Sequence, residues 1–267
     1  MASSYRALLN ALRDLGLTPH SRVIAHVSLP ALGPLAGGAE SVLGALLASS
    51  EILIMPSFTF STMVTPGAGP PENGIDYTSD KDASASINFY DPNMPSDPSM
   101  GEVSETLRCH PGARRSSHPI LSFVGINAEE ALASQTLEEP LAPIAWLADG
   151  DGDILLMGSG QSSNTSLHYA ERLADRKQFI RWALTPLGIV ECPGFPGCSN
   201  GFQAIEPHLA GVVRRAQLGS AGLQLVPLRD LIHITVAWLR EDPRALLCDR
   251  PTCERCRDVR AAVRRVV

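Results

Sequence analysis

Two side chains in the second half of the chain, His168 and Glu171, have the types and spacing of a general base and its partner. They lie three residues apart in a segment of helical character, so they share one face of the helix. A carboxylate there can hold an imidazole in one tautomer and stabilise its charged form, as proton abstraction requires. A surface histidine with an incidental acidic neighbour gives the same pattern, and the pair alone leaves both interpretations open.

A second candidate is the turn that follows a predicted strand at 22–28. It runs from His26 to Gly33 and leads through Gly37 and Gly38 into a helix. Backbone amides in such a turn, with the N-terminus of the next helix, suit the pyrophosphate of a nucleotide-like ligand. The segment has neither a Walker A loop nor a G-x-G-x-x-G pattern. Glycines that serve only the geometry of the turn are the alternative.

A third candidate is the pair Arg114 and Arg115, which Ser116 and Ser117 follow just before a predicted strand. Guanidinium groups and hydroxyls can bind phosphate oxygens through charge-assisted, partly bidentate hydrogen bonds. Two adjacent arginines on a solvated face are the ordinary alternative.

The cysteines raise the question of a metal site. A C-x4-C-x2-C run formed by Cys248, Cys253 and Cys256 lies in a polar tail. Zinc needs four ligands, and the fourth would have to be Cys192, Cys198 or His208. Because the spacing is irregular, reduced and unligated thiols are the favoured interpretation. Structural zinc stays open but is not favoured, and we assign no metal ligand.

A long acidic stretch at 65–99 is rich in Pro, Gly, Asp, Asn and Ser. Connections of this length are usually functional or disordered, and composition does not choose between the two. If the stretch is functional, its negative centre would attract a cationic substrate. The candidate binding residues there are Asp76, Asp80 and Asp82.

The elements that must position these residues alternate between helix and strand. Apolar periodicity and turn residues predict helices at 5–15, 37–47, 100–109, 128–133, 163–176, 201–217 and 228–240. Strands are predicted at 22–28, 52–55, 120–124, 154–157 and 223–226. This order predicts an α/β fold with a mixed, largely parallel sheet flanked by helices. We expect a single domain over 1–267, with the acidic loop at 65–99 and a Cys-rich tail at 246–267.

Composition narrows the class of protein. At 267 residues the chain can bury a sizeable core, and its apolar runs are too short to cross a membrane. The formal net charge of −6 argues against a nucleic-acid partner. We see no signal peptide, so a cytoplasmic location is expected, with the chain a monomer or a homodimer.

Six segments, in chain order, resemble the aminoglycoside 3-N-acetyltransferase family, also called antibiotic N-acetyltransferases. They are His26-Val27-Ser28-Leu29 with Leu32-Gly33, Met55-Pro56-Ser57-Phe58-Thr59, the block from Asp91 to Arg108, Arg115-Ser116-Ser117-His118-Pro119 with Ser122-Phe123, Asn164-Thr165-Ser166-Leu167-His168 with Glu171, and Cys198-Ser199-Asn200-Gly201-Phe202. Leu29-Pro30-Ala31 departs from the family, whose members often carry serines there.

The resemblance implies an α/β fold distinct from that of the common GNAT acetyltransferases, with acetyl-CoA as the acetyl donor. It makes His168 the catalytic base, with Glu171 as the orienting carboxylate and His26 near the thioester. The cofactor would be bound by two segments, represented by His26, Val27, Ser28, Leu29, Gly33, Arg114, Arg115 and Ser117. The customary acceptor is the 3-amino group of a 2-deoxystreptamine antibiotic, for which Glu171 and the acidic loop are candidate binding residues.

Two alternatives to this expectation stay open. The first is an acetyltransferase for another small-molecule amine, such as a biosynthetic intermediate or an aminophosphonate. The second is a non-enzymatic binding protein stabilised by zinc. Assays with a set of amine substrates distinguish the first alternative from an aminoglycoside acetyltransferase. Metal analysis together with a coenzyme A binding test distinguishes the second.

Overall fold

A seven-stranded mixed sheet organises the chain, which a computed structural model describes over residues 3–78 and 87–263. The strand order is β4-β5-β2-β1-β6-β10-β9. The strands are β1 (Arg22–Val27), β2 (Ile52–Pro56), β4 (Arg114–Arg115), β5 (Phe123–Ile126), β6 (Asp153–Met157), β9 (Arg214–Leu218) and β10 (Ala221–Pro227). The central strands β2, β1 and β6 are parallel, and the outer neighbours are antiparallel. The predicted mixed α/β sheet is therefore confirmed, with its parallel part confined to the three central strands.

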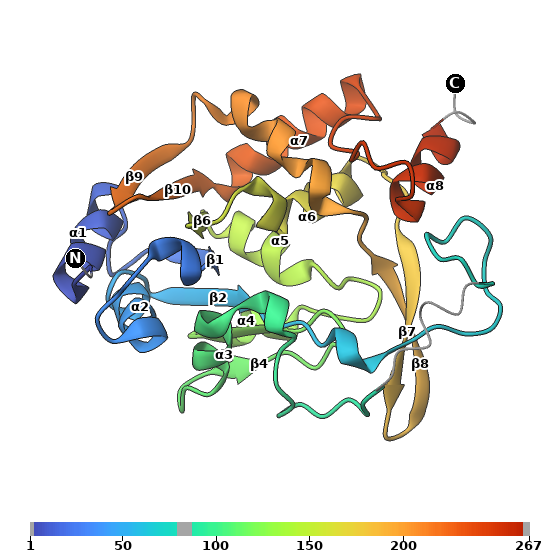
Figure 1. Cartoon of the computed structure of the whole chain (residues 1–267), viewed down its shortest axis with the longest axis horizontal. Coiled ribbons are helices and arrows are strands. Elements are labelled where there is room, and N and C mark those ends of the chain that lie inside the picture. Colours follow the sequence, from blue (N-terminus) through green and yellow to red (C-terminus); the bar gives the residue numbers. More distant parts are fainter. Residues whose placement is uncertain (1–2, 79–86, 264–267) are drawn as a thin grey trace.

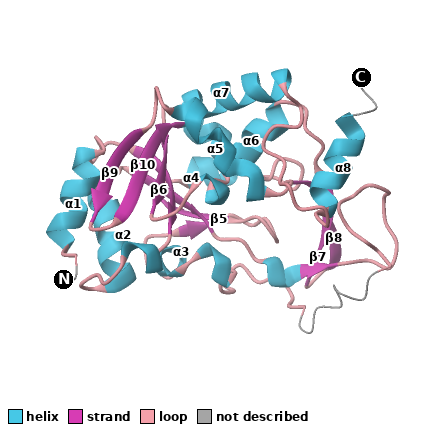
Figure 2. Ribbon diagram, turned by 45° about the horizontal axis from the view of Figure 1, so that its top comes forward, coloured by secondary structure: helices cyan, strands magenta, loops and turns pink. Residues whose placement is uncertain are grey.

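Each face of this sheet is covered by helices (Figures 1 and 2). One face packs against α1 (Tyr5–Asp14), α2 (Gly38–Ala48) and α3 (Glu102–Arg108). The other packs against α4 (Glu129–Ala133), α5 (Ala142–Asp149), α6 (Ser166–Leu173) and α7 (Leu228–Glu241). The result is three layers with a core on either side of the sheet.

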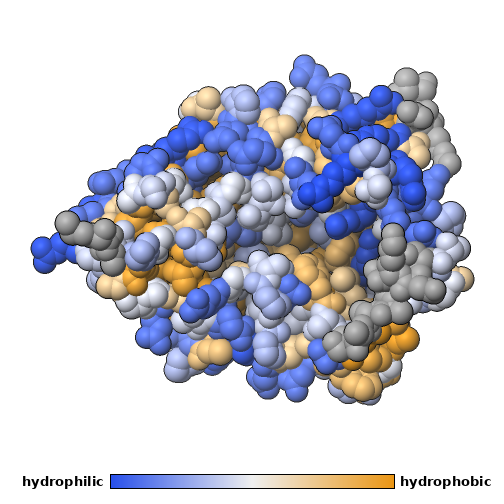
Figure 3. Space-filling model, viewed as in Figure 1, coloured by the Kyte–Doolittle hydropathy of each residue, from blue (hydrophilic) through white to orange (hydrophobic). Residues whose placement is uncertain are grey.

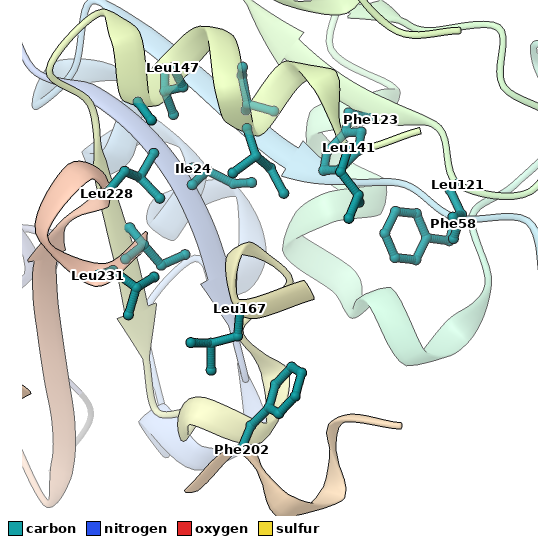
Figure 4. Packing of buried hydrophobic residues seen from close by; sticks show 14 of the residues in the cluster. Ile24, Phe58, Leu121, Phe123, Leu141, Leu147, Leu167, Phe202, Leu228 and Leu231 are labelled. Carbon is teal, nitrogen blue, oxygen red and sulfur yellow. The ribbon is translucent and has the colours of Figure 1, made fainter. Parts of the chain in front are cut away.

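Strand β1 shows why both faces are buried. Its residues alternate between the two cores, with Ile24 on the α5–α7 side and Val23 and Ala25 on the α1–α3 side. Figure 4 shows Ile24 among leucines that come from α5, α6 and α7. Each such fully buried aliphatic side chain stabilises the fold by about 1.5–3 kcal/mol. These central strands therefore give the loops at their carboxyl ends a rigid base.

A second, three-stranded sheet lies beyond the carboxyl end of β2. It consists of β3 (Met63–Val64), β7 (Phe179–Thr185) and β8 (Gly188–Phe195), all antiparallel. The tip of the β7–β8 hairpin carries Leu187, which is 99% exposed, and Ile189, which is 60% exposed. Figure 3 shows a gathering of apolar side chains at this end of the molecule.

The tail ends in α8 (Glu254–Val263), which lies at the opposite end of the molecule from α1 (Figures 1 and 2). It packs near the small sheet and the segment 72–78. The Gly74 N–H donates a hydrogen bond to Asp258 Oδ2 at 2.8 Å, and the Asp76 N–H donates one to Glu254 Oε2 at 3.1 Å. Among the residues that the structure describes, every helix is too short or too polar to cross a membrane.

Two sequence predictions need correction. Residues 201–217 do not form one helix, because a 3-10 helix covers Ser199–Leu209 and the edge strand β9 follows it. The strand predicted at 120–124 begins instead at Phe123, after a turn in which His118 Nδ1 accepts hydrogen bonds from the N–H groups of Ile120 and Leu121. The hairpin β7–β8 and the helices α5 and α8 were not predicted.

Candidate active site

A cavity of about 1100 Å³ opens at the carboxyl ends of β1 and β6. Four stretches line most of it: 25–30, 98–102, 162–165 and 195–197. Sites for one small ligand usually measure about 300–1,000 Å³. This cavity is slightly larger than that range.

The parallel pairing of β1 with β6 brings two of the predicted segments together. Val27 is in register with Met157, and the Ser28 N–H donates to the Met157 carbonyl at 2.9 Å. Gly158 then turns the chain with a φ of +64°, and a Cβ there would lie 2.9 Å from the Cβ of Ala31. Only glycine adopts this positive φ without strain and leaves room for the Ala31 side chain. The turn after β6 therefore packs directly on the turn after β1.

The start of α6 is fixed by a buried amide network. Asn164 is fully buried, its Oδ1 accepts from the Ser166 N–H at 3.0 Å, and its Nδ2 donates to Gln161 Oε1 at 2.9 Å. Gln161 in turn donates to Gln224 Oε1 on β10. This network ties the first turn of α6 to the sheet and so sets the direction in which the helix projects its side chains.

His168 lines the cavity and is held from behind by two buried charged side chains. Its Nδ1 lies 2.7 Å from Glu171 Oε2, and Glu171 Oε1 lies 2.7 Å from Arg176 Nη1. Arg176 also donates to the carbonyls of Pro243 and Ala245. Because the acceptor at Nδ1 is a carboxylate, Nδ1 carries the proton and Nε2 keeps a lone pair for a reactant.

The Phe202 ring lies against this imidazole, with the centroids 4.6 Å apart. Glu171 is 1% exposed and both of its oxygens are engaged by His168 and Arg176. Its position is that of an orienting group. The sequence prediction that Glu171 also binds the acceptor gains no support from this geometry.

His26 lines the same cavity but has a different electrostatic character. Its Nε2 accepts a hydrogen bond from the Thr165 N–H at 3.4 Å. Burial lowers the pKa of His26 from 6.5 to about 4, so the ring is neutral at physiological pH. His26 therefore joins β1 to the start of α6 as an uncharged acceptor.

The first predicted cofactor segment lines the cavity. His26, Val27, Ser28, Leu29 and Gly33 all line the cavity. Their part of the wall faces Pro98–Glu102, and Gly101 approaches the Val27 carbonyl so closely that a Cβ would lie 3.2 Å from it. The two stretches therefore lie side by side in the cavity wall.

The second predicted cofactor segment does not line the cavity. Arg114 and Ser117 are exposed on or beside β4. Arg115 uses its guanidinium to hold protein groups, donating to Ser122 Oγ at 3.0 Å and to the carbonyls of Met94 and Ser57, each at 2.5 Å. Arg115 therefore fastens the stretch before Pro98 to the end of β2, and its prediction as a phosphate ligand gains no support.

The neighbouring motif residues also have architectural roles. Ser116 exchanges hydrogen bonds with the backbone of Phe123. Burial lowers the pKa of His118 from 6.5 to about 4, and its neutral Nδ1 accepts from two backbone N–H groups. These contacts place Leu121 in the cavity wall.

The predicted acidic residues lie elsewhere. Asp76 is exposed and accepts hydrogen bonds from the backbone and hydroxyl of Thr78, outside the cavity lining. Asp80 and Asp82 fall outside the described residues. The carboxylate that does line the cavity is Glu102, at the start of α3. Glu102 was not among the residues predicted from the sequence, although it follows the Met100-Gly101 pair directly.

Arg255 was also missed. It lies in α8, far along the chain from the other lining residues, yet it reaches the cavity and donates to the Gly197 carbonyl at 2.9 Å. The same tail brings Cys248, Cys253 and Cys256 beside Cys198, so that the four sulfur atoms all lie within 4.8 Å of one another. Cys192 and His208, the other two candidate fourth ligands, are not part of this group.

A family model described as aminoglycoside 3-N-acetyltransferase matches residues 24–240. Among known proteins, the aminoglycoside N(3)-acetyltransferase IX of Micromonospora chalcea is 34% identical, over 85% of this chain and 90% of the relative. The aminoglycoside N(3)-acetyltransferase VII of Streptomyces paromomycinus is 31% identical, over 88% of this chain and 90% of the relative.

The solved structures agree in fold. The apoenzyme of aminoglycoside acetyltransferase AAC(3)-IVa superimposes with a TM-score of 0.80 at 26% identity, over 98% of each chain. A histidine-to-alanine variant of that enzyme has been solved in complex with a gentamicin, with a TM-score of 0.79 at 26% identity and the same coverage. Together with the paired imidazole and carboxylate at the carboxyl ends of β1 and β6, these matches show that the chain belongs to the aminoglycoside 3-N-acetyltransferase family.

Proposed function

We propose that the chain transfers an acetyl group from acetyl-CoA to the 3-amino group of a 2-deoxystreptamine aminoglycoside and so confers resistance. The observation that carries the proposal is the buried His168–Glu171–Arg176 chain at the wall of a cavity of about 1100 Å³. Family membership supports the choice of donor and acceptor. A cytoplasmic location stays a prediction.

Only the neutral amine can attack a thioester, because an ammonium group has no lone pair, so the ammonium form of the acceptor first loses one proton to solvent. A base is then needed for the second proton, which the nitrogen loses as it forms the amide. In our mechanism His168 Nε2 accepts the amine proton as the C–N bond forms, while Nδ1–H remains bonded to Glu171. The C–S bond then breaks, and the coenzyme A thiolate receives the proton from the imidazolium. Arg176 holds Glu171 in place throughout through its ion pair with Oε1.

The cavity also suggests where each reactant lies. The stretch His26–Pro34 and the residues Pro98–Glu102 border one side, which we assign to acetyl-CoA. The acceptor would then bind between His168 and the wall formed by Phe195–Gly197 and Arg255. Thr165 lines the cavity three residues before His168, and its hydroxyl is our candidate donor to the developing oxyanion.

A thiol-release assay with gentamicin, kanamycin and apramycin tests the proposal. We expect acetyl-CoA-dependent release with at least one of them, a product acetylated at the 3-amino group, and protection of a susceptible bacterial host that expresses the chain. Absence of turnover with every 2-deoxystreptamine antibiotic would contradict the assigned acceptor.

One observation favours a second acceptor class. The described part of the cavity wall carries a single carboxylate, Glu102, against one guanidinium, Arg255. A guanidinium at the wall suits an amine that also carries an anionic group. An aminophosphonate or an amino acid in the same assay tests this alternative, and turnover faster than with the antibiotics would favour it.

A further inference from the structure

The four clustered cysteines come from two places in the chain. Cys198 follows Gly197 directly and precedes the 3-10 helix Ser199–Leu209, whereas Cys248, Cys253 and Cys256 lie in the tail and in α8. Cys198, Cys248 and Cys256 are buried, and Cys253 is partly exposed. All four are free thiols.

The spacing of the sulfur atoms fits one tetrahedral ion. Zinc binds thiolates at about 2.3 Å, which places the corners of the tetrahedron about 3.8 Å apart. Every pair of these sulfurs lies within 4.8 Å, so shifts of about 1 Å or less would close them on an ion. We propose that Cys198, Cys248, Cys253 and Cys256 bind one structural zinc ion, which fastens the tail to the wall of the cavity.

The surroundings of the cluster hold it in place. Gly201 approaches the tail so closely that a Cβ would lie 2.4 Å from the Leu246 carbonyl oxygen. Arg260 donates to the Cys248 carbonyl, and the Arg257 N–H donates to the Cys253 carbonyl at 2.9 Å. Backbone contacts of this kind orient the ligand residues before an ion arrives.

Charge around the cluster also suits a tetrathiolate site. Four thiols lose four protons when they bind Zn²⁺, and the resulting centre carries a charge of −2. Helix α8 carries three arginines, Arg255, Arg257 and Arg260, against two carboxylates, and one of these, Asp258, pairs with Arg257. Figure 3 shows strongly hydrophilic side chains gathered around this helix. Cys253, the least buried ligand, gives an ion a route of entry.

The proposed ion would stabilise one side of the active site. Gly197, next to Cys198, and Arg255, next to Cys256, both line the cavity and are hydrogen-bonded to each other at 2.9 Å. This part of the inference rests on the proposed function, because it assigns that wall to the acceptor. We therefore expect removal of zinc to raise the KM for the amine more than the KM for acetyl-CoA.

Metal analysis of the purified full chain, made under reducing conditions, tests the site independently of activity. We expect about one zinc per chain in the unaltered protein. Cys198→Ser and Cys253→Ser should each lower zinc content at least fivefold. The matched controls are Cys109→Ser, at an exposed thiol, and Cys192→Ser, at a buried thiol outside the cluster, and both should keep their zinc.

A second measurement covers variants that fail to fold. Chelator-treated unaltered protein should melt at a lower temperature, recover on addition of Zn²⁺ and not recover with Mg²⁺. When loaded with Co²⁺ instead, it should show the visible absorption of tetrahedral thiolate coordination. Labelling of thiols should find the four cluster cysteines protected with zinc and reactive without it.

Three results would overturn the proposal. They are an unaltered chain without stoichiometric zinc after growth in zinc-containing medium, stoichiometric iron in its place, and disulfides among the four cysteines. If zinc is present and no amine is acetylated, the metal site stands and the proposed function fails. If zinc loss leaves both KM values unchanged, the link to the acceptor wall is wrong.

Discussion

The two ring nitrogens of His168 lie in different surroundings. Nδ1 is bonded at 2.7 Å to a carboxylate that is itself neutralised by Arg176, whereas Nε2 is the nitrogen left for the cavity. A second imidazole in the same wall, His26, is kept neutral by burial, which lowers its pKa to about 4. Of the two, only His168 has a carboxylate beside it to stabilise the imidazolium that forms when a proton is accepted.

Replacing the base should therefore affect the chemical step much more than binding. We expect His168→Ala to lower kcat about 10²- to 10⁴-fold, the usual contribution of a positioned base. Coenzyme A affinity, measured by calorimetry, should stay near that of the unaltered protein. The exposed His20 provides the control, since His20→Ala should leave both values unchanged. A near-normal kcat for His168→Ala would contradict the assignment.

The Glu171–Arg176 pair should contribute strongly to stability because both side chains are buried. Glu171→Gln leaves the Arg176 charge without its partner, and we expect it to lower the free energy of unfolding by about 3 kcal/mol. The double variant Glu171→Gln/Arg176→Met should lose less free energy of unfolding than the two single variants lose together, by about 1 kcal/mol or more. Urea unfolding of the four proteins in this cycle gives the values.

A surface pair offers the matched control for this cycle. Arg172 and Glu139 also form an ion pair, but their side chains are 25% and 51% exposed. Glu139→Gln should therefore change the free energy of unfolding by less than about 1 kcal/mol. Additive effects in the buried cycle would show that Glu171 and Arg176 do not stabilise each other.

At the residue level, local spacing could predict the partner of His168 but not the rest of its surroundings. The i,i+3 relation to Glu171 is visible in the sequence. Arg176 follows the end of α6, where the chain bends back, and Arg255 comes from a helix in the tail. Their contacts depend on tertiary packing, which helical periodicity does not encode. For Arg115 the sequence suggested a phosphate ligand, but its guanidinium donates hydrogen bonds to backbone carbonyls instead.

At the level of elements, the turn between β4 and β5 is held by a histidine that must stay uncharged. His118 is 4% exposed, and its Nδ1 accepts from two backbone N–H groups. Burial lowers its pKa from 6.5 to about 4 in the folded protein. Between these values the unfolded chain binds more protons than the folded one, so stability falls as the pH falls through this window.

The pH dependence of stability should change when this histidine is removed. We expect the unaltered protein to lose about 2–3 kcal/mol more than His118→Asn between pH 7 and pH 4.5. Asparagine keeps an acceptor oxygen near the Nδ1 position and does not titrate. Urea unfolding at a series of pH values measures the difference, with His20→Asn as a control that should follow the unaltered protein. Parallel curves for His118→Asn and the unaltered protein would refute the buried neutral state.

The elements differed in how well periodicity predicted them. The buried central strands and amphipathic helices, such as β1, β6 and α7, carry strong apolar patterns and were found. Residues 201–209 were assigned to an α-helix, because apolar residues three apart, such as Phe202 and Ile205, fit both an α-helix and a 3-10 helix. Strand β7 was not predicted because an arginine at its inward position 181 interrupts the apolar alternation. The Arg181 guanidinium lies over the rings of Phe179 and Phe195.

Across the whole molecule, three segments that lie far apart in the sequence meet beside the active site. Asn73 is buried, and its side chain pairs with the backbone N–H and carbonyl of Ile180 on β7 at 2.8 and 3.1 Å. The next residue, Gly74, donates to Asp258 on α8 at 2.8 Å. The acidic loop, which the sequence could describe only by its composition, thus begins as a link between the small sheet and the tail.

Breaking this link should loosen the segments on both sides of it and leave the main sheet unaffected. We expect Asn73→Ala to lower the free energy of unfolding by about 1–3 kcal/mol, because it removes both hydrogen bonds between the Asn73 side chain and the Ile180 backbone. Amide hydrogen exchange should become faster in residues 72–78, in β7 and in α8, but not in β1 or β6. Asn10→Ala, at an exposed position on α1, is the control and should change none of these rates.

Faster exchange in β7 with unchanged exchange in α8 would mean that the tail is held by other contacts, of which the four-cysteine cluster is the foremost. Hydrogen exchange measured again after removal of the metal would then show how much each set of contacts holds the tail. The two contributions are separable because the cluster and the segment that follows Asn73 contact the tail through different residues.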